Sequence, residues 1–221
     1  MKQQNLPATD LIPDNEVIVR VLRGEKDLYA LLVRRYNQRL YRVGMSLLND
    51  DAEVEDAMQA AYIHAYESLG RFEFKASFST WLTKILINEC LLRIKKRKRS
   101  VLMDTEMMNS GSYQQLTTDT QTPFKKVLNS ELKNILQEAI CNLPEKYRTV
   151  FVMREIEHMN VAETQHCLDI SEVNVKVRLN RAKALLRESL STYYPKEEIL
   201  HFHLKRCDKM VELVMQKIKL L

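Results

Sequence analysis

The sequence predicts an all-α fold of two small helical domains, an N-terminal helical bundle and a C-terminal helix-turn-helix domain, joined by a flexible linker. Three observations support this prediction. Apolar residues recur every three or four positions along most of the 221-residue chain, which is the spacing of helices with one buried face. Only 4 Gly and 5 Pro are present, too few for the many tight turns of an all-β protein. Hydrophobic residues make up 45% of the chain, enough to build real cores.

The N-terminal extension, residues 1–24, is expected to contain one short helix. Asp14 can cap it, because a side-chain oxygen can satisfy the first backbone amides of a helix. Gly24 can end it, since glycine accepts the backbone conformation that follows a last helical turn.

Residues 25–99 are expected to complete a compact bundle of about four helices. Apolar spacing predicts one helix over 26–48, which Asn49 ends, and a second that ends at Gly70. A loop over 71–75 precedes a further helix, which Ser77 or Ser79 can cap. Its core-facing residues are Phe78, Trp81, Leu82, Ile85 and Leu92.

Residues 100–124 are interpreted as the linker. Ser, Thr, Asn, Gln and Gly dominate there, every charge is acidic, and no apolar period persists. The segment follows the basic run Arg93–Arg99, which ends the bundle.

The C-terminal domain is predicted over residues 125–192, with a helix beginning at Pro144 and a short helix over 161–167. A tight turn follows, and Ser171 can cap a long helix that reaches about residue 191. The C-terminal extension, 193–221, is expected to form one amphipathic helix.

Two helices joined by a short turn are typical of the helix-turn-helix, whose second helix enters the major groove of DNA. Lys and Arg can bind phosphate, and Asn or Arg can read base edges. The alternative is an ordinary bundle with a solvated basic face. The residues expected on the exposed face are Asn174, Lys176, Arg178, Asn180 and Arg181.

Residues 143–190 resemble region four of extracytoplasmic-function (ECF) sigma factors, which direct RNA polymerase to promoters. The match includes Leu143-Pro144, Tyr147-Arg148, and the run from Val175 to Ala182. Asp169 replaces the family's turn glycine, and Gln165 replaces a small residue. The resemblance implies that the last helix reads the minus-thirty-five promoter element. The residues that it assigns to this role are Ser171, Glu172, Asn174, Lys176, Arg178, Asn180 and Arg181.

Residues 25–99 resemble region two of the same family through the acidic segment 53–59. The resemblance implies docking on the clamp helices of the largest polymerase subunit. A plain acidic first turn, which complements the helix dipole, is the alternative. The residues assigned to polymerase binding are Glu55, Asp56, Gln59, Tyr62 and Tyr66.

The segment 78–88 is similar to the family's helix that binds the minus-ten element as its strands separate. Unpaired bases can stack on aromatic rings while basic side chains follow the backbone. Trp81 precedes Ile85 by one turn, so a core position is the stronger interpretation for it. The residues assigned to this element are Phe72, Phe74, Lys75, Ser79, Trp81, Lys84, Asn88, Arg93 and Lys96.

The resemblance predicts a sigma factor without catalytic activity or a cofactor. Its implied partners are core RNA polymerase, through the clamp helices and the flap of the second-largest subunit, promoter DNA, and the anti-sigma factor that family members often have. No metal is expected, because His201, His203 and Cys207 lack a fourth ligand. The alternative is a helix-turn-helix regulator that binds duplex operator DNA without polymerase, which leaves the Trp81 and Asn88 helix without a role.

A cytoplasmic chain without membrane insertion is expected from composition. The four cysteines are scattered and include no CxxC pair, which favours a reducing compartment. The first ten residues lack the apolar run of a signal peptide. No stretch reaches the ~18 apolar residues of a membrane helix. The net charge of +5 is modest, so its location matters more than its size.

Overall fold

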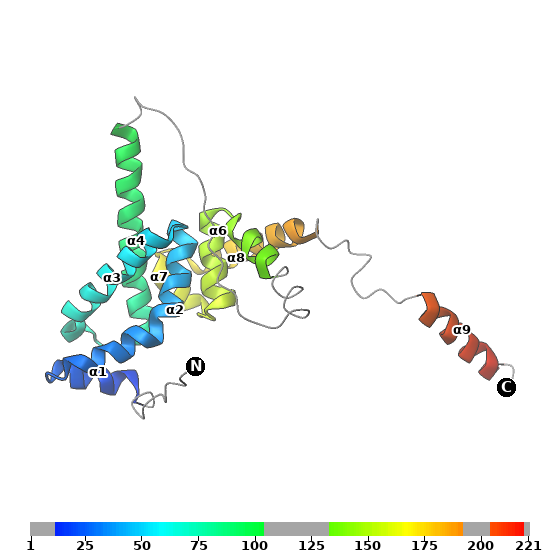
Figure 1. Ribbon diagram of the computed structural model, residues 1–221, viewed down its shortest axis with the longest axis horizontal. Coiled ribbons are helices and arrows are strands. Elements are labelled where there is room, and N and C mark those ends of the chain that lie inside the picture. Colours follow the sequence, from blue (N-terminus) through cyan, green and yellow to red (C-terminus); the bar gives the residue numbers. More distant parts are fainter. Residues whose placement is uncertain (1–11, 104–132, 192–203, 219–221) are drawn as a thin grey trace, which may run out of the picture.

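The computed structural model describes residues 12–103, 133–191 and 204–218, and within these ranges every regular element is helical (Figure 1). Most of the expected linker, residues 104–124, lies outside the described residues, as do His201 and His203. No helix in the described ranges is both long enough and apolar enough to cross a membrane.

Four α-helices form the N-terminal bundle: α1 (Asp14–Leu22), α2 (Tyr29–Leu48), α3 (Asp51–Glu67) and α4 (Phe78–Met103). The predicted boundaries are largely confirmed, but the prediction that Asp14 caps α1 is wrong: Pro13 precedes the helix, and the Asp14 carboxylate instead accepts from Arg35 and Tyr36 of α2. Gly24 has φ +111°, a conformation that favours glycine, just after α1. Asn49 ends α2 in the left-handed region, and the Asp50 side chain accepts the amide of Glu53 to start α3. The Ser77 hydroxyl accepts the amide of Thr80 at 3.2 Å at the start of α4.

The bundle core lies where α2, α3 and α4 cross. Gly44 of α2 is required there, because a Cβ at this position would lie 2.9 Å from a methyl carbon of Val54 in α3. Leu92 was expected to face this core, and that prediction is wrong: its side chain is 60% exposed. The buried residues Cys90 and Ile94 lie two positions before and after it, so Leu92 points to the opposite side of the helix.

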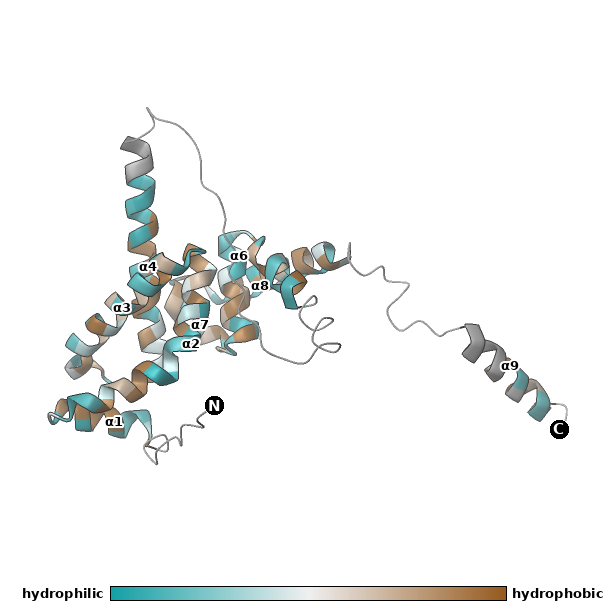
Figure 2. Cartoon of the chain, viewed as in Figure 1, coloured by the Kyte–Doolittle hydropathy of each residue, from teal (hydrophilic) through white to brown (hydrophobic). Residues whose placement is uncertain are grey.

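Helix α4 continues through the basic run to Met103, past residue 100 where the linker was expected to begin. Its 26 residues contain no Gly or Pro, and Lys and Arg are good helix formers. Figure 2 shows this hydrophilic second half projecting beyond the rest of the bundle. The basic side chains are therefore carried on a rigid helix.

The C-terminal unit consists of a helix over residues 133–141, α6 (Glu145–Phe151), a π-helical turn η4 (Val152–Ile156), α7 (Val161–Leu168) and α8 (Glu172–Ser191). Pro144 precedes α6 as predicted. A small core joins the 133–141 helix to α8. Its buried members are Ala139, Leu143, Ala182 and Leu186. Figure 1 shows the last helix, α9 (Leu204–Ile218), apart from both units.

The two units pack against each other. Helix α7 lies on α4, and α6 lies on α2 (Figure 1). Three residues of the C-terminal unit, Met153, Met159 and Cys167, are buried as part of the same apolar cluster as the N-terminal bundle. The described chain is thus in a closed arrangement, which the sequence did not predict.

Candidate nucleic-acid interface

Helices α7 and α8 form the predicted helix-turn-helix. A reciprocal capping box starts α7: the Asn160 side chain accepts the amide of Glu163 at 2.8 Å, and the Glu163 carboxylate accepts the amide of Asn160 at 2.7 Å. Asp169 makes the turn with φ 51°, a left-handed conformation that aspartate tolerates better than most residues. The Ser171 hydroxyl then accepts the amide of Asn174 at 3.3 Å, and Val175 anchors α8 in the core.

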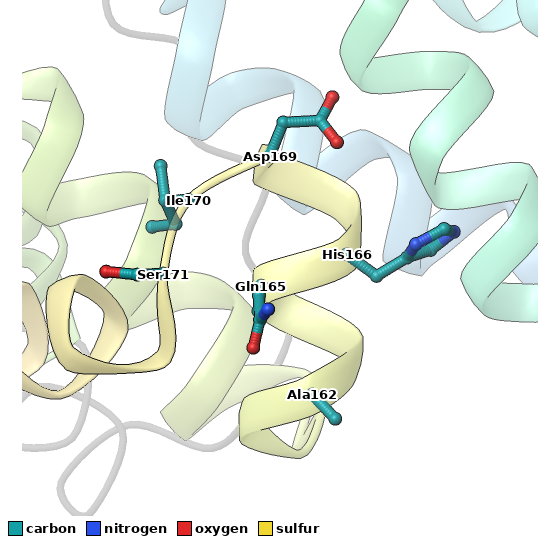
Figure 3. Close-up of a pocket in the computed structure, with 6 residues that line it drawn as sticks. All are labelled: Ala162, Gln165, His166, Asp169, Ile170 and Ser171. Atoms are coloured by element: carbon teal, nitrogen blue, oxygen red, sulfur yellow. The ribbon is translucent and has the colours of Figure 1, made fainter.

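Gln165 and Asp169 border an open hollow of about 530 Å³ beside α7 and the turn into α8 (Figure 3). Figure 3 shows the side chains of His166 and Asp169, which also line this hollow, on α7 and at the turn that follows it. Helices α7 and α8 still pack together, so the long Gln165 side chain does not prevent the motif from forming.

Most residues assigned to the minus-thirty-five element lie on the open side of α8. Arg178 is the exception and is half-buried. The Lys176 ammonium lies 3.4 Å from the Glu172 carboxylate, one turn earlier. This exposed pair leaves both side chains accessible to a ligand. The exposed members of the set are Ser171, Glu172, Asn174, Lys176, Asn180 and Arg181.

The aromatic residues assigned to the minus-ten element form a cluster at the start of α4. Phe72 is buried, with its ring centroid 5.0 Å from that of Trp81 and 4.7 Å from that of Phe74. Trp81 is half-buried and packs on Phe78 as well, which agrees with the core interpretation. Phe74 is 45% exposed and has φ 57°, so it is the ring of this cluster that solvent reaches most.

The polar residues assigned to the minus-ten element differ in accessibility. Lys75, Asn88 and Lys96 are exposed. Ser79 is partly buried, and its hydroxyl lies 2.9 Å from that of Ser77. Arg93 is half-buried and donates to the Glu89 carboxylate at 3.1 Å. Asn88 and Lys96 lie two turns apart on α4, so one face of this helix carries both.

Lys84, the remaining minus-ten candidate, is held by the helix-turn-helix. Its ammonium donates at 2.9 Å to the carboxylate of Asp169 and at 2.9 Å to the carbonyl of His166. One turn earlier, the Thr80 hydroxyl donates to the Glu163 carboxylate at 3.0 Å. Helix α7 therefore covers the side of α4 that carries Thr80 and Lys84.

A second set of polar contacts joins the units at α2. The Glu157 carboxylate, only 7% exposed, lies 3.3 Å from Nε of Arg39 and 3.1 Å from Nη1 of Arg42. Nearby, buried Arg148 donates from Nε to the Ser46 carbonyl at 2.8 Å. These pairs could not be predicted from the sequence, because their partners are more than one hundred residues apart.

The residues assigned to polymerase binding divide into two groups on α3. Glu55, Asp56 and Gln59 are exposed. Tyr62 is buried, and its hydroxyl donates to the Val33 carbonyl at 3.0 Å, so it holds α3 against α2. Tyr66 is half-buried, with its ring against Tyr29.

Ile63 is a residue of this surface that the sequence analysis missed. Its side chain is 52% exposed, and it follows Gln59 by one turn on the same side of α3. The available signal in the sequence was an isoleucine four positions after Gln59, on the polar side of the predicted helix.

Two cysteines are deeply buried. Burial raises the pKa of the Cys90 and Cys167 thiols to about 12. Cys167 lies between the units, with its sulfur 3.4 Å from the Thr80 carbonyl oxygen. Buried thiols of this kind react slowly at neutral pH, and Cys167 is buried in part by its contact with α4.

Family comparisons match both units. Residues 32–100 match the family model "Sigma-70 region 2", and residues 133–186 match "Sigma-70, region 4". The chain is 34% identical over 176 residues to the ECF RNA polymerase sigma factor SigW of Bacillus subtilis, which covers 78% of this chain and 94% of that protein. It is 28% identical over 182 residues to the RNA polymerase sigma-H factor of Pseudomonas aeruginosa, covering 80% and 93%.

Solved structures share the fold. The sigma factor RpoE, in complex with the anti-sigma factor NepR from Bartonella quintana, aligns with a TM-score of 0.60 at 18% identity, over 74% of this chain and 96% of that one. CnrH, in complex with the cytosolic domain of CnrY, aligns with a TM-score of 0.55 at 21% identity, over 81% and 97%.

Proposed function

Because the chain belongs to the family of ECF RNA polymerase sigma factors, we propose that it binds core RNA polymerase, recognises both promoter elements and assists DNA melting. It would do so by binding alone, without a cofactor or catalysis of its own. The observation that supports this best is the presence of both family units in one chain, each with its assigned polar face largely exposed on a helix.

The α3 surface of Glu55, Asp56, Gln59 and Ile63 is the proposed docking site for the clamp helices of the largest subunit. This surface has three polar side chains around one exposed apolar side chain, a pattern that suits a protein partner. In such interfaces the central apolar contacts supply most of the affinity, and the surrounding polar groups fix the orientation of the partner. The C-terminal unit would bind the flap of the second-largest subunit.

The proposed minus-ten surface consists of Phe74 with the α4 residues Lys84, Asn88 and Lys96. An accessible ring can stack on an unpaired base, while the cations bind the strand's phosphates. The rings of Phe72 and Trp81 pack against other aromatic side chains, so they would not stack on bases themselves. Their role would be to hold the ring of Phe74 in position. Helix α8 would enter the major groove of the minus-thirty-five element.

The closed arrangement conflicts with simultaneous use of these surfaces. Lys84 cannot neutralise a phosphate while its ammonium is bonded to Asp169 and His166. We therefore expect the two units to separate before the minus-ten element binds. An anti-sigma factor that favours the closed form would keep the chain inactive. The sigma factor RpoE, which shares the fold, is itself seen in complex with an anti-sigma factor.

In-vitro transcription tests this proposal. Purified core polymerase is incubated with a library of genomic fragments, with and without the chain, and transcript start sites are mapped. The proposal predicts new starts that share two spaced upstream motifs. The variant with Asp56→Ala and Gln59→Ala, which alters the proposed polymerase-docking surface, should give fewer transcripts from the same start sites.

The alternative of a regulator that acts on duplex operator DNA without polymerase is not favoured by the family matches, and it predicts the opposite pattern. It would give no new starts and tight, sequence-specific binding of duplex DNA by the chain alone. That outcome would overturn the sigma-factor proposal for this chain.

A further inference from the structure

Two valines occupy the centre of the exposed side of α8. The side chain of Val173 is 67% exposed and that of Val177 is 48% exposed. They are four positions apart, so they lie next to each other along one face of the helix. Both belong to the first two turns of α8, the part of a recognition helix that reaches base edges.

Their position opposite the core is fixed by the helical repeat. Val175, Ala182 and Leu186 are the buried residues of α8. Val173 and Val177 are each two positions from Val175, which places them about 160° around the helix from it. Neither valine belongs to the buried core of this domain, and α7 is the helix that lies on α4.

Polar residues flank the two valines. Asn174, Lys176 and Asn180 are exposed on either side of them. Valine has a lower helix propensity than many residues that an exposed helical position could hold. In the described structure the exposed surface of its methyl groups also contributes no hydrophobic stabilisation. The two valines thus form an apolar strip between side chains that can make hydrogen bonds. A complementary partner surface would carry methyl groups between polar groups, as the major groove of DNA does where thymine is present.

We infer that Val173 and Val177 recognise thymine, by packing on its C5 methyl group in the minus-thirty-five element. Among the four bases, thymine alone presents a methyl group in the major groove, and small apolar side chains are suited to contact it. The flanking Lys176 would hold the helix by a phosphate contact, which carries no sequence information. The inference rests on the proposed function, because α8 must enter the groove.

Deoxyuridine provides the test, since it differs from thymidine only by lacking that methyl group. The probe is a duplex promoter found by the transcription experiment, with each thymine of its minus-thirty-five element replaced singly by deoxyuridine. Binding is measured with the full chain assembled with core polymerase. At one or two positions, the substitution should lower the affinity of the complex for the duplex by about threefold to fivefold, which is the effect of removing one buried methyl group.

The variants Val173→Ala and Val177→Ala show which valine contacts which thymine of the minus-thirty-five element. Each should bind the thymine promoter more weakly and should lose the sensitivity to deoxyuridine at its own position only. Val173→Thr and Val177→Thr keep the side-chain shape but replace one methyl by a hydroxyl, and should show an intermediate sensitivity. Val19→Ala, an exposed valine of α1, is the matched control and should retain the full response.

Two results would overturn the inference while leaving the proposed function intact. One is a wild-type complex that initiates at the promoter but binds every deoxyuridine duplex as tightly as the thymine duplex. The other is a loss on deoxyuridine substitution that persists at the same size in both alanine variants. Failure of the proposed function would instead appear earlier, as an absence of promoter-specific starts.

Discussion

The ammonium of Lys84 in α4 lies 2.9 Å from the carboxylate of Asp169, at the turn between α7 and α8. Lys84 belongs to the proposed minus-ten surface, and Asp169 stands where the family has a glycine. If Lys84 binds the minus-ten strand as proposed, its ammonium must exchange this carboxylate for a DNA phosphate. Asp169 thus gives the closed arrangement an ion pair that a glycine could not supply.

Replacing Asp169 by Asn should shift the chain toward the open form. Asparagine tolerates φ 51° but lacks the charge, so the turn should survive while the ion pair is lost. Because Asp169 is 74% exposed, the pair contributes ~1 kcal/mol or less, and opening should increase by about fivefold at most. Peptide-resolved alkylation of Cys167, which lies against Thr80 of α4 in the closed form, measures this.

Asp169→Gly, which restores the family's residue, should raise the alkylation rate of Cys167 to the same extent. Asp27→Asn removes an exposed carboxylate elsewhere in the chain and serves as the control. Equal Cys167 alkylation in wild type and both Asp169 variants would mean that the ion pair does not stabilise closure.

Replacing Glu157 by Gln should open the units more than the Asp169 variants do. The buried carboxylate is bonded to both Arg39 and Arg42, and hydrogen bonds to charged groups contribute about 1.5–3 kcal/mol each. Small-angle scattering should show a larger radius of gyration, with unchanged helix content by circular dichroism.

Arg42→Ala is the graded comparison for Glu157→Gln. Arg42 is more exposed than Arg39, and Glu157 keeps the Arg39 contact in this variant, so opening should be weaker. A Glu157→Gln chain as compact as wild type would show that the charge of Glu157 is not needed to hold the units together.

The α3 surface can be tested apart from DNA. Asp56→Ala with Gln59→Ala should weaken binding to core polymerase by about tenfold, because both exposed side chains would face the same partner. Glu16→Ala on α1 removes an exposed carboxylate outside this surface and should have no effect. Affinity is measured by titration of labelled chain, and equal affinities for all three proteins would refute the clamp-helix assignment.

Stability should fall at alkaline pH. Burial raises the pKa of Cys90 and Cys167 from 9.0 to about 12, so the folded state holds these protons more tightly than the unfolded state. Their contribution is complete below pH 9 and is lost as the pH rises toward 12. The melting temperature should decline over this window.

The variant with Cys90→Ala and Cys167→Ala should show a shallower decline in melting temperature. Part of the decline should remain, because burial also raises the pKa of Tyr29 and Tyr62. An identical pH profile in the variant and the wild type would exclude the thiols as its source.

Local signals allowed much of the fold to be predicted. Apolar spacing identified the helices, and two short polar side chains marked where helices start: Ser77 and Ser171 each accept a hydrogen bond from a backbone amide at a predicted start, whereas Asp14 does not. Leu92 was misassigned because a long helix offers several apolar positions and periodicity alone does not select the buried ones. The α4 helix passed its expected end because residues 100–103, which are mostly apolar, were grouped with the polar segment that follows them.

The closed arrangement could not be predicted, because it depends on polar pairs between distant segments. Glu163 illustrates the difficulty. One of its carboxylate oxygens completes the capping box with Asn160, and the other accepts the Thr80 hydroxyl across the interface. In the sequence only the first role is visible, since nothing in the residue types around Thr80 indicates that α7 lies on it.

The most direct test of the account is a reversible lock between Lys84 and Asp169. Both are replaced by Cys in a chain whose native cysteines are removed, and the new pair is joined by a bis-maleimide linker that contains a reducible disulfide. The linked chain should not support initiation by core polymerase, and reduction should restore initiation to the level of the unlinked variant. Equal initiation before and after reduction would contradict the claim that α7 must leave α4 before the promoter can bind.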